Sequence, residues 1–143
     1  MLIDSQNQFS SAQAVTSTGA TASTNVIDLG VARDVGGAVT EPLMLLCEVT
    51  TPFASGGSAT MQVQVQTSAD NSSWATLAQS DAIPVASLVQ GYRFLPGDLP
   101  GPTSRYLRLN YVVGTAAMTA GAFTAALVPS LDTQPVYPRG YVA

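Results

Sequence analysis

Residues 61–66 read Met-Gln-Val-Gln-Val-Gln, with apolar and polar side chains in strict alternation. Successive side chains of a β-strand point to opposite faces, so this segment predicts a strand with one face in a core. Residues 70–73, Asp-Asn-Ser-Ser, are turn formers whose short side chains bond to nearby backbone. Residues 74–78, Trp-Ala-Thr-Leu-Ala, then read as a returning strand, and the whole stretch predicts a β-hairpin.

A second alternation covers residues 105–113, Arg-Tyr-Leu-Arg-Leu-Asn-Tyr-Val-Val. Its apolar face carries Leu107, Leu109, Tyr111 and Val113. Gly114 interrupts the pattern, and residues 122–128, Ala-Phe-Thr-Ala-Ala-Leu-Val, resume it before Pro129. Because glycine and proline both interrupt strands, residues 105–128 predict a second hairpin.

Shorter apolar runs predict three further strands, each followed by a glycine or proline that stops it. These runs are residues 25–29, 43–50 and 91–95, with stops at Gly30, Pro52 and Pro96. Residues 10–24 are rich in Ser, Thr, Ala and Gly, which is typical of a loop or a loosely held strand. Residues 85–89 are the one helical candidate, and they are too short to decide the fold class.

Together these segments give about seven or eight strands at short spacing, with 12 Gly and 9 Pro concentrated between them. This pattern is typical of a β-sandwich or jelly roll. The sequence therefore predicts an all-β fold, a jelly-roll or β-sandwich of about eight antiparallel strands. At 143 residues we expect one domain, since two halves would each be too small for a useful core.

The surface of this domain must be largely uncharged. Charged residues make up 10% of the chain, whereas soluble domains average roughly 25%. Ser, Thr, Gln and Asn therefore supply most of the polar cover, and such a surface repels neighbouring molecules only weakly. The chain also has no lysine, the usual guard of exposed sheet edges, so we expect partners to cover these edges.

The ionisable residues exclude several classes of partner. Five Arg stand against nine Asp and Glu, and the net charge of -4 argues against nucleic-acid binding, which depends on clustered cations. The first residues lack the parts of a signal peptide, and no stretch approaches the roughly 20 apolar residues of a membrane span. We therefore expect synthesis in a cytoplasm without export, and no membrane partner. The single cysteine, Cys47, lies in an apolar run and is predicted to pack as a core residue.

The chain lacks most catalytic side chains. Without His or Lys there is no Ser-His-Asp or Cys-His arrangement, no Schiff base and no P-loop. A glycosidase needs only two carboxyls about 5 to 9.5 Å apart, and two pairs remain open for that role: Asp28 with Asp34, and Glu41 with Glu48. Sugar-cleaving clefts also need aromatic platforms, and one Trp and five Tyr are spread widely here. We expect surface carboxylates or arginine partners, no enzyme activity and no cofactor.

Three further motifs have both a structural and a functional interpretation. Residues 30–37 could cradle an anion, but no helix pattern follows them, so a plain turn is favoured. Asp70 and Asn71 could offer oxygens to calcium, yet no ligand loop surrounds them; a turn-capping role is favoured and no metal site is predicted. Trp74 begins an apolar strand and is expected to be a core or interface anchor rather than a ligand platform.

Three segments carry a family resemblance through their order and spacing. They are Asn25-Val26-Ile27-Asp28-Leu29-Gly30 with Ala32-Arg33-Asp34, then Val63-Gln64-Val65-Gln66-Thr67-Ser68, then Arg105-Tyr106-Leu107-Arg108-Leu109-Asn110-Tyr111. From about residue 2 to residue 128 the chain resembles the tailed-phage capsid cement, or decoration, proteins of jelly-roll type. The resemblance implies a jelly-roll capsid cement domain over residues 1–128, with no catalytic motif.

The same resemblance implies where the protein works and with which partners. Such a protein is made in the cytoplasm of the host bacterium and binds the outer capsid surface of the virion. It acts as a symmetric homo-oligomer, a dimer or a trimer, and clamps neighbouring subunits of the major capsid protein. The clamp opposes the internal pressure of the packaged genome.

Residues 129–143 differ in composition and fall outside the resemblance. Three prolines block regular helix or central strand here, while Val and Tyr add apolar weight that a disordered tail usually lacks. We expect an extended C-terminal arm that docks on a sister subunit or on the shell, with Tyr137 and Tyr141 as anchors and Arg139 bonding a carboxylate. In the domain itself, the expected contact residues are Trp74, Tyr92, Arg93, Tyr106 and Arg108.

Two other functions stay open for an all-β domain of this kind. A carbohydrate-binding jelly-roll module would have a cluster of exposed aromatic residues and saturable glycan binding. A glycosidase would lose turnover when one carboxylate pair is replaced. A cement protein would instead bind capsids and raise the temperature at which they rupture.

Overall fold

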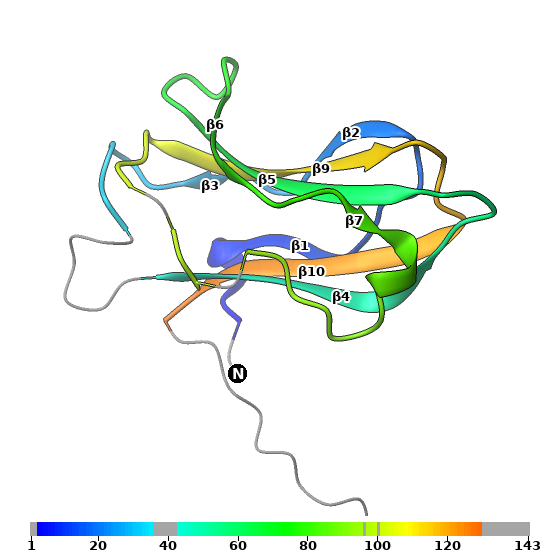
Figure 1. Cartoon of the computed structure of the whole chain (residues 1–143). Helices are drawn as coiled ribbons and strands as arrows, with labels where there is room; N and C mark the ends of the chain where they lie inside the picture. The colour runs from blue at the N-terminus through cyan, green and yellow to red at the C-terminus, as the bar shows by residue number, and fades with distance from the viewer. Residues whose placement is uncertain (1–2, 36–42, 96, 100, 130–143) are drawn as a thin grey trace, which may run out of the picture.

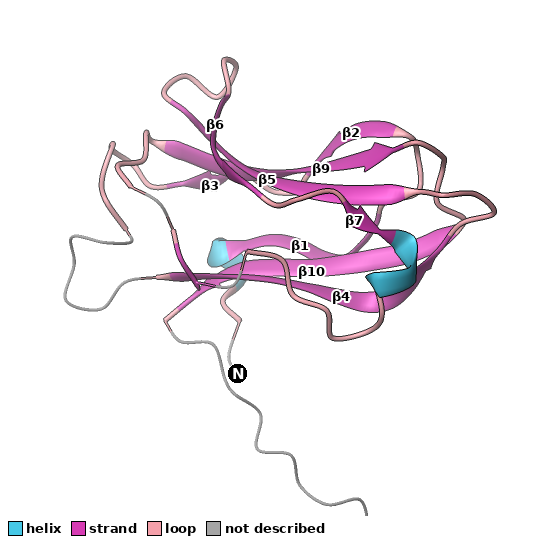
Figure 2. Cartoon of the chain, in the orientation of Figure 1, coloured by secondary structure: helices cyan, strands magenta, loops and turns pink. Residues whose placement is uncertain are grey.

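The structure, a computed structural model, describes residues 3–35, 43–95, 97–99 and 101–129. Within these residues the regular elements are ten strands and two short 3-10 helices (Figure 2). The strands form two antiparallel sheets that lie face to face as a β-sandwich, which confirms the predicted all-β class (Figure 1). No helix in this part of the chain is long and apolar enough to cross a membrane.

The two sheets are named here after their longest strands. The β4–β10 sheet has the order β1-β10-β4-β8, with bounds Gln8–Ala14, Ala120–Val128, Met44–Ala54 and Gly97–Asp98. The β5–β9 sheet has the order β2-β9-β5-β6, with bounds Gly19–Ala22, Tyr106–Gly114, Thr60–Ser68 and Ala75–Gln79. Two short strands complete it: β3, Ile27–Asp28, pairs with β9, and β7, Ile83–Pro84, pairs with β5. The 3-10 helices are η1, Ser5–Asn7, and η2, Val85–Ser87.

The two alternating segments of the sequence form the centre of the β5–β9 sheet. In β5, Met61, Val63 and Val65 are at most 1% exposed, and the four inward residues predicted for β9 are equally buried. The two strands pair along their whole length, with Val63 opposite Tyr111. Since burying one large apolar side chain stabilises a fold by about 1.5–3 kcal/mol, these two strands are major contributors to the core. Cys47 of β4 is also fully buried, as predicted.

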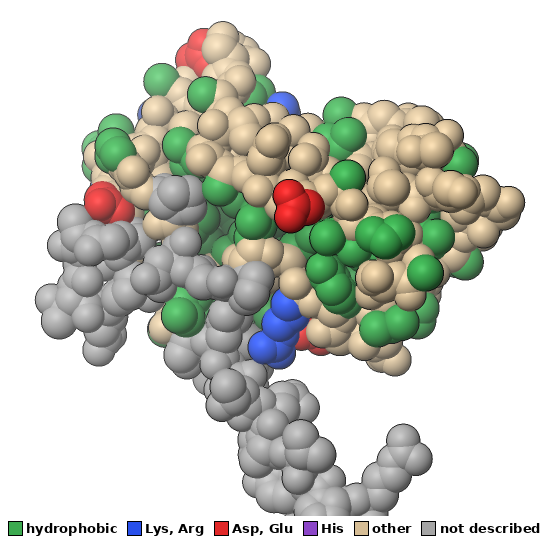
Figure 3. Space-filling model, viewed as in Figure 1, with side chains coloured by type: hydrophobic (Ala, Val, Ile, Leu, Met, Phe, Trp, Pro, Cys, Tyr) green, Lys and Arg blue, Asp and Glu red, His purple; other side chains and the backbone are tan. Residues whose placement is uncertain are grey.

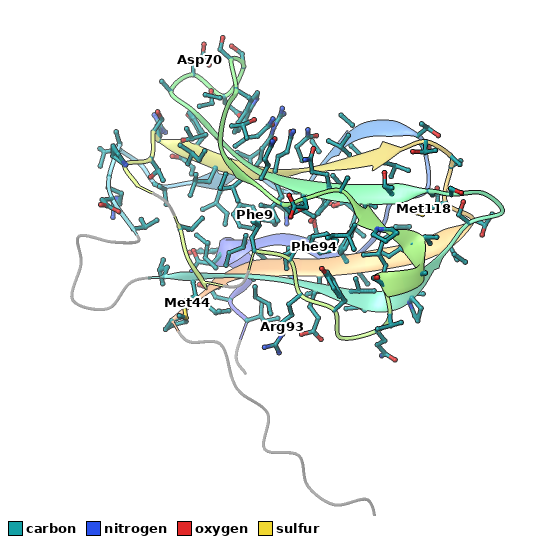
Figure 4. The ribbon with its side chains drawn as sticks, in the orientation of Figure 1. Phe9, Met44, Asp70, Arg93, Phe94 and Met118 are labelled. Carbon is teal, nitrogen blue, oxygen red and sulfur yellow. The ribbon has the colours of Figure 1, made fainter. Side chains whose placement is uncertain are left out.

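Aromatic rings join the two sheets across the core. Phe123 of β10 stacks on Tyr111 of β9, with ring centroids 4.8 Å apart and planes 12° apart. Phe123 also meets Phe53 at 4.7 Å and Phe94 at 5.5 Å, and Figure 4 shows Phe94 between the sheets. The buried hydroxyl of Tyr111 shares a 2.8 Å hydrogen bond with the hydroxyl of Ser10 on β1. The core therefore contains a polar group whose bonding is satisfied.

The predicted hairpin over residues 105–128 is wrong, whereas the hairpin of β5 and β6 is confirmed. β9 and β10 follow each other in the chain but lie in different sheets, and their link crosses from one layer to the other (Figure 1). Each strand presents an apolar face that must be buried. Packing β9 and β10 face to face across the core buries both faces, as the stacked rings of Tyr111 and Phe123 show.

Two predictions around β4 also differ from the structure. Residues 91–95 form no strand: this segment lies beside β4 through backbone hydrogen bonds, and Arg93 forms only an isolated bridge to Glu48. β4 does not stop before Pro52 but continues to Ala54. Pro52 is exposed and lies where the register with β10 shifts, so its missing N–H removes no ladder hydrogen bond.

Residues 10–24 hold most of β1 and all of β2, although their composition suggested a loop or a loosely held strand. The pairing of β1 with β10 shifts register between Ser10 and Gln13. Ala12 lies inside this irregularity with φ of 47°, and its N–H donates to the Thr124 hydroxyl at 3.1 Å. A bulge of this kind interrupts the alternation of side chains, which explains why the sequence shows no strand pattern here.

Candidate interaction surface

The outer face of the β5–β9 sheet carries two neighbouring rows of polar side chains. They come from β9, β5 and β6, whose register places them directly opposite one another. The rows, here called the polar ladder, are Asn110, Gln64 and Gln79, and then Arg108, Gln66 and Thr76. They lie together because the residues of β5 and β9 that point outward alternate with the apolar residues that enter the core.

Hydrogen bonds run through the ladder from β9 to β6. Arg108 Nε donates to Gln66 Oε1 at 2.9 Å, and Gln66 Nε2 donates to Gln64 Oε1 at 3.3 Å. Gln64 Nε2 then donates to Gln79 Oε1 at 3.4 Å, and Asn110 Nδ2 donates to Gln64 Oε1 at 2.9 Å. Gln66 and Asn110 are each only 9% exposed. The amides of Gln66 and Asn110 are therefore held by burial and by hydrogen bonds within the ladder, whereas Gln79 at the end of its row is exposed.

Arg108 is held from two sides. Its guanidinium lies over the half-buried ring of Trp74, 4.1 Å from the ring centroid, and its Nε bonds to Gln66. Partial burial lowers the pKa of Arg108, but an arginine stays charged because its ordinary pKa is above 12. Within the part of the chain that the structure describes, no carboxylate pairs with this guanidinium.

Tyr106 occupies the next outward position of β9. The guanidinium of Arg105 lies 4.9 Å from its ring centroid. Arg105 also donates to both oxygens of Asp28, from Nε at 2.8 Å and from Nη2 at 2.7 Å. These bonds, with help from the Gly30 N–H, lower the pKa of Asp28 to about 2. Three of the five predicted contact residues, Trp74, Tyr106 and Arg108, thus lie on one outer face.

The other two predicted contact residues lie at the opposite side of the sandwich. Tyr92 is half-buried and packs edge-on against Phe94, with ring centroids 5.0 Å apart, so its ring supports the core. Arg93 points away from the sandwich (Figure 4), and its Nε lies 2.8 Å from Glu48 Oε2. The predicted contact residues therefore divide into two groups, one beside each sheet.

A small apolar cluster lies on the outer face of the β4–β10 sheet. Leu46, Ala126 and Val128 are at most 3% exposed, and Met44 packs against them. Leu45 and Leu127, their neighbours in sequence, belong to the main core, so the cluster faces the other way. The two outer faces of the sandwich thus differ: one is a polar ladder and the other has a buried apolar patch.

Three of the carboxylates, on Asp28, Glu48 and Asp70, serve ion pairs and a turn. Asp70 Oδ1 accepts from the backbone N–H groups of Ser72 at 2.9 Å and Ser73 at 2.8 Å, which confirms its predicted role as a turn cap. These hydrogen bonds lower the pKa of Asp70. Asp28 is engaged by Arg105, as described above. Among the residues described, no three His, Cys, Asp or Glu side chains gather where they could hold a metal ion.

The predicted C-terminal arm lies outside the described residues. This holds for its three expected contact residues, Tyr137, Arg139 and Tyr141, and for Glu41 of the second carboxylate pair. The docking role of the arm therefore stays a prediction.

Sequence reasoning did not identify the polar ladder as a unit. A signal was present, because residues 62–66 place three glutamines on one face of a strand. Their partners on β9 and β6, however, depend on strand register, which is set by pairing between distant segments. Figure 3 shows the wider setting: apolar and neutral polar side chains dominate the visible face, and charged groups are few.

Comparison with known proteins adds one positive finding. The family model described as Bbp16 matches residues 9–127. This range runs from β1 into β10, so it includes both sheets and the whole polar ladder. A search of curated proteins finds no match to the chain.

Proposed function

Because the chain belongs to the Bbp16 family, a phage-associated family, we propose that it is a capsid cement protein. In this proposal it binds the outer surface of the virion capsid as a homo-oligomer, a dimer or a trimer. It clamps neighbouring subunits of the major capsid protein and so stabilises the shell. It performs no catalysis and binds neither nucleic acid nor membrane.

The polar ladder is the observation that best supports this role. A partner that covers the ladder meets amides that already bond to one another, and these hydrogen bonds persist when water leaves. Gln66, Asn110 and Arg108 are held before binding, so little of their conformational entropy is lost when they dock. A largely uncharged face with a preorganised centre suits lasting contact with a protein surface. Many copies on one shell then add their weak contacts together.

The ladder face is less suited to the alternative function, carbohydrate binding. Sugar rings stack on open aromatic faces, and among the described residues Trp74 and Tyr106 are the aromatic residues on this side of the sheet. A guanidinium already occupies one face of each ring, from Arg108 at 4.1 Å and from Arg105 at 4.9 Å. The amides that would bond to sugar hydroxyls are likewise engaged with each other. We therefore favour a protein partner.

The proposal is tested by sedimentation of the purified protein with matching capsids that have been stripped of it. We expect saturable binding and a higher rupture temperature of the loaded capsids. Trp74→Ala should weaken binding, whereas Gln90→Ala, at an exposed loop position outside the ladder, should not. Thermal unfolding of both variants controls for loss of fold. A wild-type protein that stays in the supernatant, or that light scattering shows to be monomeric, would contradict the proposal.

A further inference from the structure

Arg108 differs from the other partly buried arginine of the described residues in its partners. Arg93 has Glu48 at 2.8 Å, whereas Arg108 has a ring, an amide and no described carboxylate. Its Nε is used by Gln66, and hydrogen bonds from its two Nη atoms to described residues are absent. The guanidinium is therefore fixed in place with most of its donors unused.

Covering the ladder would affect Arg108 differently from its neighbours. The amides of Gln64, Gln66 and Asn110 bond within the ladder, so they keep these partners in a dry interface. The Nη donors of Arg108 would lose water and gain nothing unless the partner supplies acceptors. Burying an unpaired charge is among the most unfavourable changes an interface can contain. A partner that seals this face must therefore place acceptors opposite Arg108, and a negatively charged acceptor is favoured because it also compensates the buried charge.

We propose that Arg108 is the anchor of the ladder face and binds the carboxylate of an Asp or Glu side chain on the capsid subunit. This inference rests on the proposed function and adds the chemistry of the contact. A guanidinium offers two parallel N–H groups that match the two oxygens of a carboxylate. Trp74 and Gln66 hold the guanidinium in place before the partner arrives, so little side-chain entropy is lost on binding.

The neutral surroundings of Arg108 make the expected partner a single carboxylate rather than an acidic cluster. The other five residues of the ladder carry no charge, and Arg105 is already neutralised by Asp28. If a partner carried several negative charges, only one of them could pair with Arg108, and the others would be buried against uncharged amides. A phosphate monoester is disfavoured for the same reason, because it carries close to two negative charges.

The first test measures the affinity of variants for stripped capsids by sedimentation. Arg108→Gln removes the charge and should lower affinity about tenfold to a hundredfold, the usual effect of losing a charge-assisted hydrogen-bonded pair. Arg108→Lys keeps the charge but loses the planar fork, and it should fall between Arg108→Gln and wild type. Arg33→Gln is the matched control, because Arg33 is exposed and lies outside the ladder. Its affinity should stay within about twofold of wild type.

The second test changes the capsid instead. Amidation of capsid carboxylates with a carbodiimide and glycinamide should weaken wild-type binding and leave Arg108→Gln unchanged, so that the difference between the two proteins disappears. Periodate treatment, which cleaves sugar diols, should leave that difference intact. If periodate removed the difference, the partner would be a glycan and the inference would be overturned.

The outcomes separate this inference from the proposed function. Capsids that bind wild type and Arg108→Gln equally well would refute the anchor and leave the cement role standing. A wild-type protein that binds no capsids would overturn both. Circular dichroism and thermal unfolding of Arg108→Gln and Arg108→Lys confirm that each variant is folded before its affinity is interpreted.

Discussion

Replacing Gly121 by alanine is expected to destabilise the sandwich through two separable effects. Gly121 lies in β10 with φ of +135°, a conformation that L side chains rarely adopt. A Cβ at this position would also overlap the ring of Phe53. That ring is packed against Phe123, with centroids 4.7 Å apart, so it cannot yield without disturbing the aromatic layer between the sheets.

The size of the loss follows from adding the two effects. A positive φ costs a non-glycine residue about 1–2 kcal/mol, and overpacking a core costs typically about 1–3 kcal/mol. Gly121→Ala should therefore lose about 2–5 kcal/mol, a large part of the roughly 5–15 kcal/mol that holds a domain folded. Gly30 is the matched control, because its φ is +77° and nothing lies within 4 Å of a Cβ built there. Gly30→Ala should lose only the backbone part, about 1–2 kcal/mol.

Urea unfolding followed by circular dichroism measures both losses. The free energy of unfolding is extrapolated for wild type, Gly121→Ala and Gly30→Ala, and the slopes are compared to confirm two-state behaviour. The difference between the two variants contains the overlap with Phe53 together with the extra backbone strain at φ of +135°, which lies farther from the left-handed region than +77°. Equal losses in both variants would refute the reasoning, since they would mean that the Phe53 ring moves aside at no cost.

Three further predictions concern charge, the thiol and the arm. Folding lowers the pKa of Asp28 from 3.8 to about 2, so the ionised carboxylate stabilises the fold above about pH 4, and this stabilisation is lost as the pH falls toward 2. Asp28→Asn should therefore weaken the pH dependence of the urea midpoint between pH 4 and pH 2. A pH dependence equal to that of the wild type would contradict this. Cys47 is fully buried, which raises its pKa, so a thiol reagent should label it only as fast as the protein unfolds; rapid labelling of native protein would count against it. Truncation after Pro129 should lower capsid occupancy or oligomer mass, and no change in either would refute a docking arm.

The sequence predicts a strand most reliably where the alternation of apolar and polar side chains is visible within the strand itself. Residues 61–66 of β5 alternate strictly, β9 places an apolar residue at each of its inward positions from 107 to 113, and every inward residue named for the two strands is buried. The sequence does not predict β1 as a firm strand, because the bulge at Ala12 breaks its period. The same kind of pattern predicts a hairpin turn between β9 and β10, whereas the structure places the two strands in different sheets. Alternation predicts that a strand has two faces, but it does not identify the sheet the strand joins.

The candidate surface is likewise predictable from local sequence only in part. Trp74, Tyr106 and Arg108 were predicted as contact residues one at a time, from residue type and strand position. Their gathering on one face depends on two pairings, of β5 with β9 and of β5 with β6, and on the irregularity between Val65 and Gln66. The ion pair of Arg93 with Glu48 also depends on a distant pairing, because the two residues lie 45 positions apart.

The structure offers another explanation for the absence of lysine, which lies in the edge strands of the two sheets. Exposed edge strands invite pairing with other chains, and the sequence led us to expect partners along them. The edge strands β8, β2 and β6 have only two, four and five residues, and the edge strand β1 carries a bulge. Short and bulged edges discourage pairing without any charge. The sandwich therefore needs no partner to protect its edges, and a partner gains more area from a sheet face. The other five residues of the polar ladder are uncharged, and its central amides bond to one another, which leaves Arg108 as the group that a partner must satisfy.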